Sequence, residues 1–513
     1  MSSPVAGCDP LNTNVALNLW RAAEHHGARP AVVERDSCMD YATLLQRTGA
    51  IAAGLLAAGV DPDSPVAILL ERGGDAVAAY FATLAIGAIA VLLNDALRPR
   101  QIEYILGHSG ARHLVTTAEI LRRQPRAVQA DVRVLEVGAM REGGTSPLVP
   151  APRAGNDVAQ LIYTSGSTGS PKGVVVSHAN LAAGTGAVVS YLGITPDDRI
   201  AALLPFSFVY GLSQVLCATA TGAALVVERS PLAPQIVESV RANRVTVLAA
   251  VPPLWHRLLS VAAFRNSPIP TLRAMTNAGG HLPTAAVRAL RRAQPAAQLY
   301  LMYGLTEALR STYLPPEEVD RRPDSIGRAI PGAELYVVRD DGTPAATDEV
   351  GELVHRGPTV TLGYWKDADR TAQVFRPDPL RPAGAPGTER VVFTGDLVRR
   401  DADGFLYFVS RRDRIIKTMG YRVGPDEIAN VLYDSGEVAD AAVVGEPDDQ
   451  WGQRIVVHVV LTAGGSVERL KAYCGRELPR YLQPARFEVR DALPLLPSGK
   501  HDLAAVRGSR GAA

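Results

Sequence analysis

Short apolar runs alternate with helix-like segments along the first half of the chain, and this alternation constrains the fold more than any other feature. Val66 to Leu70, Ile89 to Leu93 and His113 to Thr117 have the length and composition of buried strands. Helix-like segments separate them, among them Gln101 to Gly107. Strands that alternate with helices usually form a parallel sheet with helices on both faces, so we expect doubly wound α/β layers.

The same pattern returns further along the chain and predicts a second parallel layer. Ile200 to Leu204, Ala224 to Val227 and Val245 to Ala250 have the composition of buried strands, and Leu212 to Ala220 is a helix candidate. No sequence repeat relates the two regions. At 513 residues the chain is too long for a single core, so we expect two or more domains.

The end of the chain has a different order, which predicts a smaller α+β region. Ala441 to Val444 and Arg454 to Leu461 are two strand candidates in succession. Ser466 to Leu478 is a helix candidate, and Ala485 to Val489 is a further strand candidate. We expect the residues beyond Val506 to form a tail.

Composition and charge exclude several classes of protein. The chain is 47% hydrophobic and 20% charged, as ordinary globular proteins are. A net charge of +1 gives no electrostatic basis for binding nucleic acid or an anionic membrane, so we expect neither as a partner. The four cysteines lie far apart, without a metal-ligand spacing or a convincing disulfide framework. Because we also find no signal peptide, we expect a cytoplasmic protein.

One uncharged stretch has the length of a membrane-spanning helix but predicts a different structure. Ala76 to Leu93 contains 18 residues without a charge. Gly87 interrupts it, and the residues from Ile89 onward have the composition of a strand. We therefore expect a helix that ends at the glycine and is followed by a buried strand.

A segment rich in glycine and hydroxyl residues follows the strand candidate Val158 to Ile162. Glycine lets successive backbone N–H groups converge on one anion, and hydroxyls and a lysine add donors and a mobile charge. The segment differs from the common NTPase loop, because Pro171 occupies the place of its second glycine. A flexible surface loop is the alternative. The predicted phosphate cradle comprises Thr164, Ser165, Gly166, Ser167, Thr168, Gly169 and Lys172.

Two further motifs follow strand candidates and suit a nucleotide. Gly279 and Gly280 allow the plane of a base to lie against the backbone, and Tyr303 can stack on it. Thr306 can donate to a phosphate, and Glu307 can hold Mg²⁺, which shields the charge of ATP oxygens. The alternative is a helix N-terminus with Thr306 as its cap and Glu307 in its first turn.

Lysine is scarce in this chain. Of 53 basic residues only five are lysine, so arginine is used wherever a generic cation suffices. A lysine that is retained is more often needed for its compact ammonium, which differs from a planar guanidinium. The five are Lys172, Lys366, Lys417, Lys471 and Lys500.

These motifs resemble those of the adenylate-forming superfamily, which comprises acyl-CoA synthetases, adenylation domains of peptide synthetases, and luciferases. Tyr163 to Gly173 resembles the signature loop of the superfamily, and Tyr303 to Glu307 resembles its Y-G-x-T-E motif. Further motifs follow in family order at Thr394 to Asp396, Ser410 to Ile428 and Leu495 to Lys500. The resemblance therefore spans nearly the whole chain.

The resemblance implies a large multi-layer N-terminal domain with doubly wound α/β sheets and a small, mobile α+β C-terminal domain. It implies an AMP-binding domain at residues 1–409, a hinge at 410–413 and a mobile domain at 414–513. Asp413 would be the pivot, and Ser410 stands where the family has glycine. Arg376 to Arg390 is the most linker-like stretch, but the motif that follows it implies that the large domain continues.

The resemblance also implies roles for individual residues in joining an acid to the α-phosphate of ATP. Lys500 would bridge the acid and the α-phosphate, and Lys417 would reach the acyl site after the small domain turns. Asp396 would accept both ribose hydroxyls, with a turn aspartate as the alternative. Arg411 would meet ribose or phosphate. The remaining nucleotide-binding positions that it implies are His281, Gly304 and Arg422.

The aromatic run after Ile200 to Leu204 resembles the acyl pocket of the family. It lies beyond a strand end, where α/β proteins bind ligands, although a core aromatic cluster is the alternative for any single residue. The aspartate that holds an α-amino group in peptide-synthetase domains is missing here, which argues against a standard α-amino acid. The predicted pocket residues are Phe206, Phe208, Val209, Tyr210 and Gly304.

The resemblance leaves the acid and the acceptor open. It implies ATP and Mg²⁺, a small carboxylic acid, and CoA or the pantetheine of a carrier protein as the acceptor. A relative with an unusual acid or acceptor, such as an amine or nitrite, would carry the same motifs. A luciferase-like oxygenase and an inactive binding protein are further alternatives. The intact Lys172, Glu307, Asp396 and Lys500 argue against the inactive protein.

Overall fold

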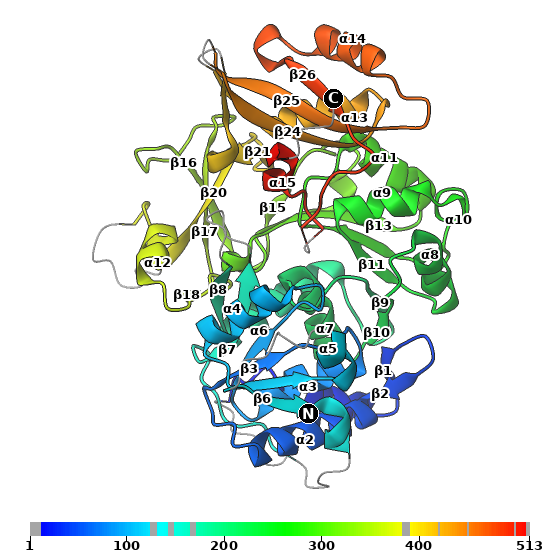
Figure 1. Ribbon diagram of the computed structural model, residues 1–513, viewed down its shortest axis with the longest axis vertical. Helices are drawn as coiled ribbons and strands as arrows, with labels where there is room; N and C mark the ends of the chain where they lie inside the picture. Colours follow the sequence, from blue (N-terminus) through cyan, green and yellow to red (C-terminus); the bar gives the residue numbers. More distant parts are fainter. Residues whose placement is uncertain are drawn as a thin grey trace.

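The computed structural model of the chain describes residues 12–123, 131–141, 148–164, 171–381, 390–418, 421–448, 451–496 and 499–508. These residues form four β-sheets. The N-terminal layers lie at one end of the elongated molecule and the C-terminal domain at the other (Figure 1).

The first sheet has seven strands and carries the predicted cradle. In spatial order they are β18 (Gly363–Tyr364), β8 (Lys172–Ser177), β7 (Val158–Thr164), β4 (Ile89–Leu92), β3 (Pro65–Ile68), β5 (His113–Thr116) and β6 (Arg133–Glu136). The strands from β7 to β6 are parallel, whereas β8 and β18 are antiparallel to their neighbours. Thr164 pairs with Lys172, so the two ends of the cradle segment lie side by side.

The second sheet has nine strands and supplies the second predicted layer. In spatial order they are β15 (Arg328–Ala329), β14 (Thr312–Leu314), β13 (Gln298–Tyr303), β12 (Ala274–Asn277), β11 (Val247–Ala250), β9 (Arg199–Ala202), β10 (Ala224–Val227), β1 (Pro30–Val33) and β2 (Cys38–Asp40). The strands from β13 to β1 are parallel. The parallel layers that the sequence predicts are therefore present.

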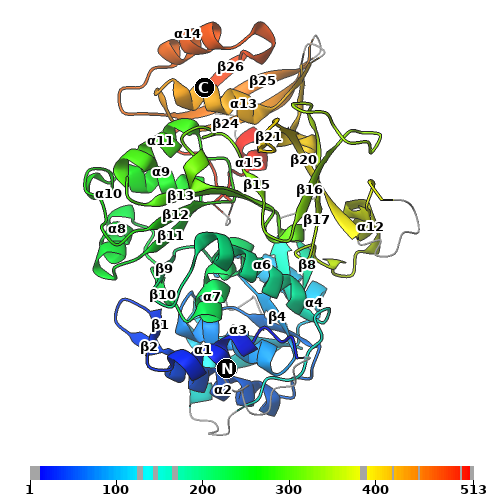
Figure 2. The same ribbon diagram turned by 180° about the vertical axis from the view of Figure 1, so that it is seen from behind.

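Helices fill the spaces around and between these sheets (Figure 2). Those up to residue 293 are α1 (Leu17–His26), α2 (Tyr41–Ala57), α3 (Gly74–Ala85), α4 (Pro99–Ser109), α5 (Ala118–Arg123), α6 (His178–Leu192), α7 (Val209–Thr221), α8 (Ala233–Ala242), α9 (Pro252–Ser260), α10 (Ala262–Arg265) and α11 (Thr284–Ala293). The short 3₁₀ turns of this part are η1 (Val137–Arg141), η2 (Thr306–Ala308) and η3 (Pro316–Glu318).

The uncharged stretch around α3 is a core helix. Every residue of α3 except Asp75 is buried, and the helix shares one hydrophobic core with strands of both sheets. Gly87 follows it with φ +79° and leads into β4, as the sequence predicts. A helix that is apolar on all sides belongs between two layers. In the described part of the chain, no helix is both long enough and apolar enough to cross a membrane.

A third sheet is antiparallel, and the sequence did not predict it. Its strands are β16 (Glu334–Val338), β17 (Gly351–Arg356), β20 (Arg390–Arg400), β19 (Phe375–Pro377) and β21 (Leu406–Arg411), with α12 (Ala368–Val374) beside them. Because β20 pairs with β17 and β19, Asp396 belongs to this sheet. The chain thus returns to the large domain after the Pro-rich stretch.

The C-terminal domain is α+β, as the sequence predicts. Its sheet contains β23 (Tyr421–Val423), β22 (Ile416–Thr418), β25 (Gly452–Leu461), β24 (Val438–Asp448) and β26 (Arg486–Val489). Its helices are α13 (Pro425–Asp434), α14 (Val467–Glu477) and α15 (Leu503–Gly508), and its short 3₁₀ turn is η5 (Arg480–Leu482). Because α15 extends past Val506, the predicted tail is wrong for residues 507 and 508. The remaining residues lie outside the described part.

The small domain rests on the large one through α13. Tyr433 of α13 stacks on His256 of α9, with ring centroids 5.7 Å apart and planes at 15°. Between the two domains, β21 leads into the 3₁₀ turn η4 (Arg412–Arg414), which contains Asp413. Ser410, at the position where a glycine was expected, is fully buried in β21.

Candidate active site

A lysine, a glutamate and a tyrosine meet where the first two sheets adjoin. Lys172 Nζ lies 2.6 Å from Glu307 Oε1 and donates to the Tyr364 hydroxyl at 2.8 Å. Tyr364 in turn donates to Glu307 Oε1 at 2.6 Å. The three side chains come from β8, η2 and β18, so the fold brings two predicted site residues together with one that was not predicted.

Glu307 is held in its ionised form although it is only 8% exposed. Burial alone would raise its pKa, but the charge of Lys172 and hydrogen bonds from Lys172 and Tyr364 lower the pKa below its ordinary value. Thr361 fixes the main chain at this point, because its N–H and its hydroxyl both donate to the Glu307 carbonyl at 3.0 Å. An ionised Glu307 carboxylate on a fixed main chain is a suitable ligand for a cation.

A second cluster joins β13 to the third sheet. The Tyr303 hydroxyl donates to Asp396 Oδ2, and Arg411 Nη1 lies 2.9 Å from Asp396 Oδ1. Burial raises the pKa of Asp396, against the opposing effects of Arg411, Tyr303 and Lys500. Asp396 follows Gly395, whose φ of +69° is a turn conformation that favours glycine. The fold thus brings together three predicted site residues, Tyr303 of β13, Asp396 of β20 and Arg411 of β21.

The Gly279–Gly280 turn follows β12 and packs closely on the chain that precedes α9. Gly279 has φ +83°, and a Cβ on it would lie 3.3 Å from Val251 Cγ1. Asn277 donates to the Gly280 carbonyl at 3.2 Å, while its buried Oδ1 has no partner among the described residues. An orphaned acceptor beside a glycine turn fits the amino group of a purine base.

His281 faces the small domain. Burial lowers the pKa of its imidazole, and Asp426 and Asn430 of α13 oppose that shift. The His281 side chain thus lies at the contact between the two domains. It also directly follows the Gly279–Gly280 turn.

The C-terminal turn brings Lys500 toward the same groups of the large domain. Gly499 has φ +78°, and a Cβ on it would lie 3.4 Å from Val251 Cγ2, so this turn packs on the residue that also borders Gly279. The Lys500 side chain keeps solvent contact. Surrounding protein and the charge of Arg414 lower the pKa of its ammonium, while Asp396 opposes the shift. Lys500 also interacts electrostatically with Glu307 and Arg411.

Several predicted residues lie outside the described part of the structure. They are the cradle residues Ser165, Gly166, Ser167, Thr168 and Gly169, and the side chains of Asp413, Lys417 and Arg422. Their roles remain predictions. Thr306 begins η2, and Thr164 ends β7 at the edge of the cradle segment.

The predicted pocket residues divide between core and cavity. Phe206 is 6% exposed and belongs to the main hydrophobic core, and Phe208 immediately precedes α7. Val209 lines a small cavity beside α7. Tyr210 donates to the Thr276 carbonyl at 2.7 Å, and Arg310 lies over its ring. Gly304 has its backbone against Arg310, because a Cβ on it would lie 2.9 Å from Arg310 Cα.

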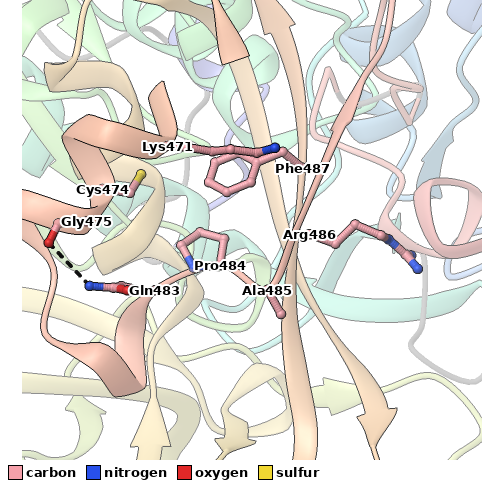
Figure 3. Close-up of a pocket in the computed structure, with 8 residues that line it drawn as sticks. All are labelled: Lys471, Cys474, Gly475, Gln483, Pro484, Ala485, Arg486 and Phe487. Atoms are coloured by element: carbon pink, nitrogen blue, oxygen red, sulfur yellow. Dashed lines mark hydrogen bonds between the residues drawn. The ribbon is translucent and has the colours of Figure 1, made fainter. Parts of the chain in front are cut away.

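A larger hollow of about 340 Å³ lies elsewhere, between α14 and β26 of the small domain (Figure 3). Lys471 Nζ lies 5.9 Å from the centroid of the Phe487 ring there, and Gln483 donates to the Gly475 carbonyl at 3.4 Å. Arg486 extends away from Cys474 and Gln483 and pairs with Glu446 and Glu488. Since these polar groups are engaged within the domain and none of the motifs is here, we place the site where Lys172, Glu307, Asp396 and Lys500 gather.

Two residues of this region were missed by sequence reasoning. Tyr364 belongs to the short strand β18, 192 residues from Lys172, and nothing local marks its hydroxyl as a site group. Arg310 follows the recognised Tyr303–Glu307 motif by three residues, and this proximity to the motif was the available signal.

The residues present fit ATP and magnesium. They include a lysine for phosphates, an orphaned acceptor beside a glycine turn that would suit a base, and a carboxylate beside a tyrosine that would suit a ribose. Mg²⁺ is commonly held by one or two protein carboxylates together with phosphate oxygens, and Glu307 would supply one such ligand. The described residues contain no group of three or more His, Cys, Asp or Glu side chains that could hold a metal by themselves.

Comparison with known sequences assigns the family. The profile of the AMP-binding enzyme family matches residues 19–365, and that of its C-terminal domain matches residues 427–500. The chain belongs to the AMP-binding enzyme family. It is thus an adenylate-forming enzyme of the AMP-forming ligase type, and the predicted superfamily and α/β fold are confirmed.

Curated relatives support this family assignment over nearly the whole chain. Novobiocin biosynthesis protein H of Streptomyces niveus is 32% identical over 97% of this chain and 83% of that protein. The L-proline–[L-prolyl-carrier protein] ligase of Streptomyces coelicolor is 33% identical over 93% of each chain. The peptide synthetase subunits that also match are far longer, and the chain spans 6% to 13% of them.

Solved structures agree with the family assignment. The o-succinylbenzoate CoA synthetase of Bacillus subtilis, bound to its acyl-adenylate intermediate, has a TM-score of 0.85 and 27% identity, with 97% of this chain and 99% of that chain covered. The same enzyme bound to ATP and a magnesium ion has a TM-score of 0.84, with 94% and 98% covered.

Proposed function

We propose that this enzyme activates a small carboxylic acid as its acyl adenylate, releases pyrophosphate, and passes the acyl group to a thiol. The convergence of Lys172 and Glu307 with Lys500, which comes from the other domain, supports this proposal most strongly. We further propose that the acceptor is CoA or the pantetheine of a carrier protein and that the enzyme acts in the cytoplasm.

The first step joins two anions, so its barrier is largely electrostatic. In our proposal Lys172 and the cradle bind the β- and γ-phosphates, Asp396 accepts the ribose hydroxyls, and Tyr303 stacks on the base. Glu307 would hold Mg²⁺, which supplies further neutralisation of phosphate charge when it is bound. Lys500 places a compact cation between the acid and the α-phosphate, where it lowers the repulsion and aligns the two.

The second step requires a different arrangement of the small domain. We propose that this domain turns about Asp413, which moves Lys500 away from the acyl adenylate and brings Lys417 to the acyl site. A hinge is a position whose backbone angles absorb such a change, and η4 occupies the connection between the two domains.

Pyrophosphate release across a panel of carboxylic acids tests this function directly. Each acid is assayed with ATP and Mg²⁺ alone, with CoA, with a phosphopantetheinylated carrier protein, and with an amine. We expect acid-dependent release in every arm and a thioester in one of the thiol arms. Amide formation without a thioester would replace the proposed acceptor, and no release with any acid would overturn the function.

A further inference from the structure

A small cavity lies beside the motif that contains Glu307, enclosed by α6, α7 and β7. Its volume is about 30 Å³, enough for roughly one or two water-sized groups. Most of its wall is apolar, with Ile162, Leu181, Val188 and Leu212 among the lining residues. A long acyl chain would not fit this space as it stands.

Two buried hydrogen-bond donors without partners line this cavity. Arg310 is 4% exposed, and its Nε has no hydrogen-bond partner among the described residues. Gln160 is 2% exposed, and the Tyr80 hydroxyl donates to its Oε1 at 2.9 Å. That contact leaves the Gln160 Nε2 group, which is also buried, without an acceptor.

The charge of Arg310 has no carboxylate beside it in the described part of the chain. Its guanidinium carbon lies 5.0 Å from the centroid of the Tyr210 ring, a cation–π contact that offsets part of the cost of burial. A buried unpaired charge is otherwise costly, and arginine does not relieve that cost by losing its proton. The buried Arg310 guanidinium therefore indicates that an anionic ligand supplies its counter-charge.

The backbone is strained where it turns Arg310 inward. Leu309 has φ +53°, which is unfavourable for a leucine side chain. Gly304 makes the close approach possible, because any Cβ at that position would collide with the Arg310 backbone. The cavity and the candidate active site therefore share one short segment, with Glu307 and Arg310 three residues apart.

We propose that this cavity is the distal end of the acid pocket and that Arg310 and Gln160 bind a second carboxylate of the substrate. The inference rests on the proposed function, because the first carboxylate is the one that is activated. A carboxylate accepts the hydrogen bonds that both orphaned donors offer and neutralises the guanidinium. The preferred acids are accordingly compact dicarboxylic acids.

The test compares each diacid with its own monomethyl ester, which removes one charge and adds one methyl group, so the change of the ratio in an Arg310 variant isolates the contribution of the charge. Succinate, glutarate and terephthalate are assayed beside their monoesters by ATP–pyrophosphate exchange. We expect the wild-type enzyme to favour at least one diacid over its monoester by about tenfold or more in kcat/KM. In Arg310→Met this ratio should fall by at least about tenfold. Equal use of diacid and monoester by the wild type would overturn the inference.

Two further variants keep the test interpretable. Arg100→Met, an exposed arginine on α4, makes the same chemical change away from the cavity and should leave the ratio unchanged. If Arg310→Met does not fold, Arg310→Lys retains the charge without the planar fork. We expect Arg310→Lys to keep the preference for the diacid, with a raised KM for it. An equal loss of exchange activity with diacids and monoesters would contradict the inference.

Calorimetric binding separates this inference from the proposed function. The diacid that gives the highest exchange rate, or terephthalate if none gives exchange, is titrated into wild type and the folded Arg310 variant. Binding to wild type that weakens at least about tenfold in the variant supports the inference even if no acid is adenylated, in which case only the function fails. Equal affinity of the diacid for both proteins would overturn the inference, even if acids without a second carboxylate are adenylated.

Discussion

Lys172 and Glu307 are 135 residues apart in the sequence, yet Lys172 Nζ lies 2.6 Å from Glu307 Oε1. The cation expected to bind phosphates and the carboxylate expected to bind a metal thus neutralise each other. ATP with its metal can take the place of this contact, because phosphates attract the lysine while the metal attracts the glutamate.

Glu307→Gln should impair the use of Mg²⁺–ATP while leaving the fold intact. The change keeps the shape of the side chain and removes the charge that would hold the metal. We expect the rate of pyrophosphate exchange at limiting Mg²⁺ to fall on the order of 10²-fold. Glu317→Gln, at an exposed glutamate of η3, is the matched control. Identical Mg²⁺ dependence in Glu307→Gln and wild type would refute the assignment.

Tyr364→Phe should weaken ATP binding to a smaller degree. The change removes the hydroxyl that Lys172 and Glu307 share, so both lose one hydrogen bond but keep each other. We expect the KM for ATP to rise by roughly three- to tenfold, the range for one lost hydrogen bond. Tyr336→Phe, whose hydroxyl donates to exposed Glu334 on β16, should behave as wild type. An unchanged KM in Tyr364→Phe would make the hydroxyl merely structural.

The sequence predicts the parallel layers and the motif positions because both depend on local patterns. Apolar runs such as Ile89 to Leu93 and the turn glycine Gly87 carry their signal within a few residues. The third sheet escaped prediction because β17 and β20 pair across an intervening Pro-rich stretch, and antiparallel pairing over that distance has no local signature.

The same reason explains which parts of the candidate site could be predicted. Glu307, Tyr303 and Asp396 lie in recognisable sequence motifs, although Asp396 lies inside β20 and not at the strand end that its motif predicted. Tyr364 lies in a two-residue strand without a motif. Arg310 is informative only once its burial and missing partner are known. Tertiary packing decides both, and no spacing rule reports it.

Buried histidines should make the folded state less stable at mildly acidic pH. Burial lowers the pKa of His355 from its ordinary 6.5 to about 4, so the unfolded chain binds a proton between these values while the folded chain does not. Stability from this group is therefore complete above pH 6.5 and is lost as the pH falls toward 4. The full loss is roughly 3 kcal/mol.

Urea unfolding of His355→Gln between pH 4.5 and 6.5 measures this effect. Glutamine retains polar atoms for Ser311 and Thr359, which lie 2.9 Å and 3.0 Å from the His355 ring nitrogens. We expect the pH slope of the unfolding free energy to decrease by up to about 1.4 kcal/mol per pH unit, equivalent to one proton. The exposed His25 provides the control, and His25→Gln should keep the wild-type slope. Equal slopes in His355→Gln and wild type would show that His355 titrates normally.

Asp413→Pro should separate the two half-reactions. Proline fixes φ near −65°, so a hinge at this position could no longer absorb the rotation of the small domain. We expect pyrophosphate exchange to stay within about threefold of wild type while thioester formation falls by about 10² or more. Asp413→Ala keeps the backbone free and should retain both activities. Equal losses in both half-reactions of Asp413→Pro would mean that the residue serves the fold.

Lys500 should act in the first half-reaction alone. In this structure it interacts electrostatically with Asp396 and Glu307, from a turn that packs on Val251 of the large domain. Lys500→Ala removes the charge. Lys500→Arg keeps the charge but replaces a compact ammonium by a planar fork, so we expect it to be nearly as impaired. ATP binding should change little in either variant, because the lysine stabilises the transition state more than the ground state.

The most direct test of the account is to assay the two half-reactions of Lys500→Ala separately. Pyrophosphate exchange with the best acid measures adenylation, and thioester formation from a pre-made acyl adenylate measures transfer. We predict that exchange falls on the order of 10²–10³-fold while transfer from the adenylate stays close to wild type. Near-normal exchange would contradict the assignment of Lys500, and with it the account of a small domain that serves the two steps in two positions.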